Sequence, residues 1–165
     1  MKRTAFLLAT LAVAACNADI TGLEPPSDPA TETFAASLNI NLSQMTRTSS
    51  GLFYEDVTVG SGKEVTDSVS TVNVTYAGFL KDGKLFDSGT NTVLTPALLI
   101  AGFREGLKGM KEGGRRKLVI PSALGYGPHS QRNTTDNSIK IPRQSTLIFD
   151  ITLIKVTNTS TTTTT

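Results

Sequence analysis

The 165-residue chain contains one cysteine, one histidine and no tryptophan. This small number of thiol and imidazole groups excludes a structural zinc site and an internal disulfide framework. Charged residues make up 18% of the chain and give a formal net charge of +2, which is too small and too evenly spread to favour nucleic acid as a partner. The 14 glycines follow no three-residue period, so a collagen-like chain is also excluded.

The chain starts with a positively charged tripeptide followed by an apolar stretch over 5–15, which is shorter than the ~20 residues needed to span a bilayer. Small residues end this stretch directly before Cys16, the single cysteine. This pattern predicts a secretory signal peptide over 1–15. The sequence VAAC at 13–16 also resembles the lipobox of bacterial lipoproteins, a family in which the cysteine is acylated and becomes the first residue of the mature chain.

The lipobox resemblance implies that the chain is exported and held by a lipid on Cys16 to the periplasmic side of the bacterial cell envelope. Asn17 follows the cysteine, where an aspartate would indicate retention in the inner membrane, so the outer membrane is favoured. Removal of the leader would leave equal numbers of basic and acidic residues. An ordinary secreted protein with a free cysteine is the alternative.

Composition divides the remaining chain into three parts. Residues 16–49 are rich in proline, threonine and serine, which predicts a flexible tether after the lipidated cysteine. Within it, polar and apolar residues alternate over 37–42, which predicts a short edge strand. Residues 50–156 form one domain of ordinary size, and the Thr-rich tail over 157–165 is expected to be disordered.

The signals within 50–156 are mostly those of strands. Apolar and polar residues alternate over 72–76 and 146–156, further β-rich runs cover 52–59 and 116–120, and an Asp-Gly turn follows Lys81. One stretch has helical spacing, with Ile100, Phe103, Leu107 and Met110 on one face. The sequence therefore predicts an α+β fold, with a mainly antiparallel sheet and one short α-helix.

Three segments carry a family resemblance. They are VTYAGFLKDGKLFDS at 74–88, IAGFREGLKGM at 100–110 continuing to IPSALGYG at 120–127, and IP at 141–142 followed by TLIFD at 146–150. Together they resemble the FKBP-type peptidyl-prolyl cis-trans isomerases. The resemblance implies a bent antiparallel β-sheet wrapped around one short α-helix, with a shallow apolar pocket between them.

The resemblance also assigns this pocket residue by residue. Phe103 would form its floor and three further aromatic side chains its walls. The Ile100 N–H and the Tyr126 hydroxyl would donate to substrate carbonyls. Asp87 at the rim would accept a hydrogen bond, either from Tyr76 or from a local amide. The implied catalytic residues are Tyr76, Phe86, Asp87, Ile100, Phe103, Tyr126 and Phe149, and the implied substrate-binding residues are Leu99 and Ile141.

The sequence departs from the family pattern in two places, and several of the residues named above also have interpretations without a functional role. The stretch between Ser88 and Ile100 is shorter than in well-known members, and the polar loop over 128–140 is longer. Strand aromatics are usually core residues, and Asp87 before Ser-Gly is also typical of a turn. The basic run at 115–117 is interpreted as a solvated strand start, and His129 as an exposed loop residue.

The chain is therefore expected to accelerate X–Pro rotation and to assist the folding of exported proteins. The expected partners are proline-containing polypeptides, macrolide FKBP ligands and a membrane, with no cofactor, no metal and no nucleic acid, and the chain is expected to be a monomer. The alternative is a non-catalytic FKBP-like chaperone or binding module, which would hold such segments without accelerating rotation.

Overall fold

The computed structural model describes residues 24–158. The expected signal peptide, Cys16 and residues 159–165 of the Thr-rich tail lie outside this range. Within it, no helix has the length and apolar character needed to cross a membrane. The last strand continues through Asn158, so the first two residues of the expected tail belong to the sheet.

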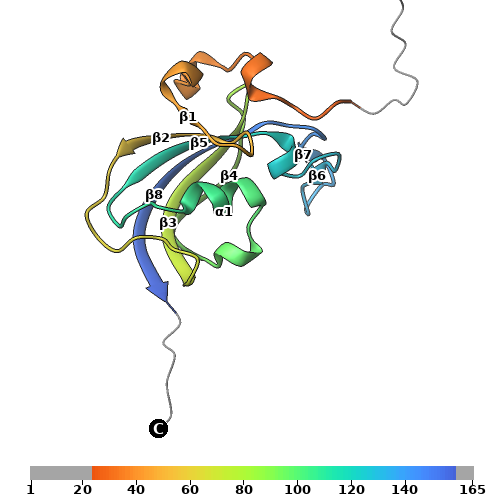
Figure 1. Ribbon diagram of the computed structural model, residues 1–165. Helices are drawn as coiled ribbons and strands as arrows, with labels where there is room; N and C mark the ends of the chain where they lie inside the picture. The colour runs from red at the N-terminus through yellow and green to blue at the C-terminus, as the bar shows by residue number, and fades with distance from the viewer. Residues whose placement is uncertain (1–23, 159–165) are drawn as a thin grey trace, which may run out of the picture.

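The described residues form eight strands, one α-helix and several short 3-10 turns (Figure 1). The strands are β1 Thr46–Arg47, β2 Phe53–Thr58, β3 Val69–Leu80, β4 Leu85–Leu94, β5 Arg115–Ile120, β6 Gln131–Arg132, β7 Ile139–Ile141 and β8 Leu147–Asn158 in the order of the chain. The helix is α1 Ala101–Leu107, and the 3-10 turns are Pro29–Thr31, Ala36–Leu38, Leu42–Gln44, Pro96–Leu98 and Ser122–Leu124.

Six of the eight strands form the main sheet, and the other two, β6 and β7, form a separate hairpin. The order in the main sheet is β1-β2-β5-β8-β3-β4, and every neighbouring pair is antiparallel. In this order β5 and β8 lie at the centre of the sheet. The long strands β3 and β8 pair with each other and curve around α1 (Figure 1). This arrangement confirms the predicted antiparallel sheet with one short helix.

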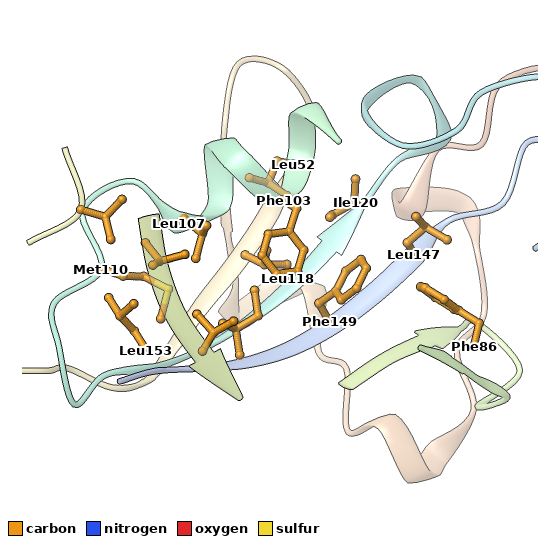
Figure 2. Close-up of a cluster of buried hydrophobic side chains, with 14 of the residues drawn as sticks. Leu52, Phe86, Phe103, Leu107, Met110, Leu118, Ile120, Leu147, Phe149 and Leu153 are labelled. Atoms are coloured by element: carbon orange, nitrogen blue, oxygen red, sulfur yellow. The ribbon is translucent and has the colours of Figure 1, made fainter. Parts of the chain in front are cut away.

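The inner face of the sheet and α1 enclose the main core. Successive side chains of a strand point to opposite faces, so alternate residues of β8 reach this core, as the pattern over 147–153 predicted: Leu147, Phe149, Ile151 and Leu153. Figure 2 shows Phe103 and Leu107 of α1 facing Leu118 and Phe149 of the sheet.

Two glycines allow α1 to lie close to β5. A Cβ atom added at Gly102 would overlap the side chain of Ile120, and one added at Gly106 would overlap Leu118. The helix therefore approaches the sheet through its glycine face, and this brings Phe103 down against the inner face.

The outer face of the sheet is covered by the segment before β2, which differs from the expected tether. Leu38 and Met45 are buried there against Phe53, Val119 and Ile148. The strand predicted over 37–42 is wrong: 3-10 turns stand at both ends of this stretch, and a two-residue strand, β1, follows at 46–47 instead. The apolar residues of this segment are buried by packing on the outer face rather than by adding to an edge.

The interpretation of the basic run at 115–117 as solvated is wrong for its middle residue. Arg116 is only 7% exposed. Its guanidinium donates two hydrogen bonds to Asp56, at 2.7 and 2.9 Å, and one each to the carbonyls of Gly106 and Lys108. It also lies over the ring of Tyr54. Arg116 thus joins β2 and β5 to the carboxyl end of α1.

Candidate active site

A pocket of about 200 Å³ opens where the start of α1 meets β3, β4 and the loop after β5. Its lining is mostly apolar: Tyr76, Asp87, Leu94, Leu98, Leu99, Ile100, Phe103, Tyr126 and Phe149. Hollows of about 270 and 360 Å³ lie elsewhere, but neither lining holds more than one aromatic side chain. The smaller pocket is therefore the stronger candidate for a site that binds an apolar group.

The base of the pocket is an aromatic cluster centred on Phe149. The ring centroids of Phe103 and Phe149 are 4.8 Å apart, with the rings nearly perpendicular at 82°. Tyr76 stands edge-on to Phe103 at 6.1 Å. Such edge-to-face contacts are a favoured geometry of aromatic pairs, so each ring restrains the orientation of the next.

Tyr76 and Asp87 form the polar side of this cluster. The Tyr76 hydroxyl donates to the Asp87 carboxylate at 3.0 Å, which is one of the two pairings that the sequence left open. Burial, this hydrogen bond and the negative charge of Asp87 raise the pKa of Tyr76 to about 12. The phenol therefore stays protonated at physiological pH and remains a donor to Asp87.

Two other donors at the pocket have no protein acceptor among residues 24–158. One is the hydroxyl of Tyr126, and the other is the backbone N–H of Ile100, the residue before the first turn of α1. Burial, followed by the charge of Asp87, raises the pKa of Tyr126, so its hydroxyl also keeps its proton. Both groups are available to donate to a bound molecule.

The structure brings most of the predicted site residues together. Those at the pocket are Tyr76, Asp87, Leu99, Ile100, Phe103, Tyr126 and Phe149. Phe86 and Ile141 are not in the lining: both are buried in the core, and Phe86 stands edge-on to Phe149 at 5.5 Å. They support the lining from behind.

Two lining residues were not predicted. Leu94 ends β4, and Leu98 lies in the 3-10 turn before α1 and is 84% exposed. No spacing rule marks an isolated leucine in a short turn as a pocket residue. Within the described range, no group of His, Cys, Asp and Glu side chains could hold a metal ion, and His129 is exposed, as expected.

Comparisons with known proteins agree on one family. The family model of the FKBP-type peptidyl-prolyl cis-trans isomerases matches residues 62–154. The FK506-binding protein of Neisseria meningitidis serogroup B is 41% identical over 112 residues, which cover 64% of this chain and 96% of that protein. The isomerase FkpA of Escherichia coli K12 is 42% identical over 112 residues, which cover 66% of this chain but only 38% of FkpA.

Solved structures give the same result. The crystal structure of Escherichia coli FkpA aligns with a TM-score of 0.60 and 39% identity, covering 70% of this chain and 52% of that one. The crystal structure of AtFKBP13 aligns with a TM-score of 0.61 and 31% identity, covering 68% of this chain and 98% of that one. The chain therefore belongs to the FKBP-type peptidyl-prolyl cis-trans isomerases.

Proposed function

We propose that the aromatic pocket takes the proline of an X–Pro segment and accelerates rotation about its peptide bond. The observation that carries this proposal is the pair of unpartnered donors, the Tyr126 hydroxyl and the Ile100 N–H, at a mostly apolar pocket. A proline ring has no donor of its own and suits an apolar lining, while the carbonyls on either side of it need donors.

The proposed mechanism follows from the nature of the barrier. Rotation about a peptide bond costs about 18–20 kcal/mol because it breaks amide resonance, and an X–Pro bond takes tens to hundreds of seconds to isomerise unaided. Water stabilises the planar, charge-separated form of the amide. A dry pocket that fits the twisted amide better than either planar form would therefore lower the barrier without a nucleophile or a proton transfer.

The donors would then orient the chain rather than react with it. Tyr126 and the Ile100 N–H would hold the substrate backbone so that the twisted bond lies over the Phe103 and Phe149 rings. Asp87 is already the acceptor for Tyr76, so its role is to fix that aromatic wall, and general-base chemistry is not required of it.

A refolding assay tests this mechanism. The full chain should accelerate the proline-limited refolding of a model protein, and Tyr126→Phe should lower kcat/KM by about two- to tenfold, the equivalent of one hydrogen bond. Tyr54→Phe is the matched control, because Tyr54 lies under Arg116 and outside the pocket lining, and it should retain full activity. A folded wild-type chain without acceleration would instead support a binding module that holds proline segments.

The cellular setting is proposed on the sequence alone. Acylation of Cys16 after removal of 1–15 would hold the enzyme at the bacterial cell envelope, where its clients would be exported polypeptides that are still folding. Eight residue steps separate Cys16 from Glu24, the first described residue, and a chain of that length spans at most about 30 Å. The enzyme would then act close to the membrane surface.

Fractionation of cells tests the anchor. Wild-type protein should take up a fatty-acid probe and sediment with membranes, whereas Cys16→Ala should lose the label and leave the membrane fraction. The released variant should keep its isomerase activity, since position 16 lies before the described domain. Persistence of the variant in the membrane fraction would rule out a lipid on Cys16 as the anchor.

A further inference from the structure

Ser27 and Ser122 are 95 residues apart in sequence and are joined by two reciprocal hydrogen bonds. The Ser27 N–H donates to the Ser122 Oγ at 2.8 Å, and the Ser122 N–H donates to the Ser27 Oγ at 2.8 Å. Ser122 is fully buried. The segment that contains Ser27 lies before residues 62–154, the part that matches the family model.

Neighbouring polar groups extend this pair into a network. The hydroxyl of Thr146, which is 1% exposed, donates to the Ser27 Oγ at 2.9 Å. The Ser122 Oγ donates to the Gln144 side-chain oxygen at 3.0 Å, and the Gln144 amide donates to the Glu24 carbonyl at 3.1 Å. The Ser27 Oγ thus accepts from two groups at a partly buried place, and neither donor has another acceptor among residues 24–158.

The same network reaches the loop that carries Tyr126. The Ser122 carbonyl accepts hydrogen bonds from the N–H groups of Gly125 and Gly127, both at 2.9 Å. These glycines stand on either side of Tyr126. The Gly127 carbonyl accepts from the Gln144 N–H at 2.7 Å. Ser122 therefore sits between Ser27 and the backbone that sets the position of the Tyr126 hydroxyl.

We propose that Ser27 is a positioning residue for the isomerase reaction, which acts through Ser122 to hold the Tyr126 hydroxyl at the pocket. This inference rests on the proposed function of Tyr126. Loss of the Ser27 Oγ leaves the buried Ser122 N–H and Thr146 hydroxyl without an acceptor, which is costly in a buried place. The turn at 122–124 must shift to recover partners, and the loop that carries Tyr126 shifts with it.

The rest of the N-terminal segment has separate attachments. Glu32 pairs with Lys81 at 3.0 Å, Lys117 donates to the Leu38 carbonyl at 2.8 Å, and Leu38 and Met45 are buried on the outer face. A change at Ser27 should therefore leave the covering of the sheet in place. A small displacement of a substrate-orienting group is enough to lower a rate.

The test compares Ser27→Ala with Ser27→Thr, which keeps the Oγ, and with Ser43→Ala, an exposed serine of the same segment that bonds only Asn41. In proline-limited refolding by the full chain, Ser27→Ala should lower kcat/KM by about two- to tenfold. The threonine variant should restore it, and Ser43→Ala should equal wild type. The Tyr126 ring signals in NMR spectra should move in Ser27→Ala and in neither of the other two variants.

The outcomes separate the two proposals. If Tyr126→Phe is impaired but Ser27→Ala keeps wild-type kcat/KM and unmoved Tyr126 signals, the role of Ser27 is overturned. A loss of activity with unmoved signals also overturns it, because the effect is then on stability alone. If Tyr126→Phe is fully active, the proposed function of Tyr126 fails first. Should Ser27→Ala not fold, Thr146→Val, which removes one donor to the Ser27 Oγ, is judged by the same two readouts.

Discussion

Replacing Arg116 with methionine is expected to lower the free energy of unfolding by about 2–4 kcal/mol. The guanidinium is buried and satisfies the Asp56 carboxylate and the carbonyls of Gly106 and Lys108. Methionine fills much of the same space but donates no hydrogen bond, so the Asp56 carboxylate and the two carbonyls lose their donor. Asp56 retains some access to solvent, which keeps the loss below that of a fully buried ion pair.

The neighbouring residue is a matched control. Arg115 also makes two hydrogen bonds to a carboxylate, that of Asp150, at 2.7 and 2.8 Å, but half of its side chain is exposed. Arg115→Met should cost less than about 1 kcal/mol, as exposed ion pairs do. Urea unfolding of both variants measures the difference. Equal losses would mean that burial does not govern the contribution of these two arginines.

Replacing Phe149 with alanine is expected to cost about 3–5 kcal/mol of stability, the usual range for removing a buried phenylalanine. It should also lower kcat/KM of the folded enzyme by about tenfold, equivalent to 1.4 kcal/mol. Phe149 contacts the rings of Tyr76, Phe86 and Phe103, so its loss releases both the floor and the walls of the pocket.

Leu153→Ala separates stability from activity. Leu153 lies on the same strand and face as Phe149 and is fully buried, but it is outside the pocket lining. The Leu153→Ala variant should have a free energy of unfolding lower by about 2–5 kcal/mol. It should keep the wild-type kcat/KM when both variants are assayed at low temperature and the rates are corrected for the folded fraction. Wild-type activity in Phe149→Ala, or an equal loss in Leu153→Ala, would contradict the assignment of Phe149 to the site.

Local patterns were sufficient for the core elements. The alternation from Leu147 to Leu153 predicted which face of β8 is buried, because the side-chain period of a strand is fixed by its backbone. The spacing of Ile100, Phe103 and Leu107 predicted the region of α1, because residues at these intervals share one face of a helix. The family motifs then supplied a set of site residues, most of which meet at one pocket.

Other features depended on contacts between distant parts of the chain. Phe86 and Phe149 look alike in sequence, yet only Phe149 reaches the pocket, because Phe86 packs behind it. The conformation of the segment over 37–42 is set by its packing on the outer face of the sheet, and the alternation of its residues did not predict it. Arg116 is buried because folding brings Asp56 of β2 and the carboxyl end of α1 into contact with its guanidinium.

The sequence by itself thus determined the class of fold, the family and the candidate residues, since these follow from local periodicity and from motifs of neighbouring residues. Only the tertiary structure decided which aromatic rings line the pocket, which charges are buried, and that Ser27 is bonded to the turn before Tyr126. These outcomes depend on which distant surfaces approach each other, and no local pattern records that.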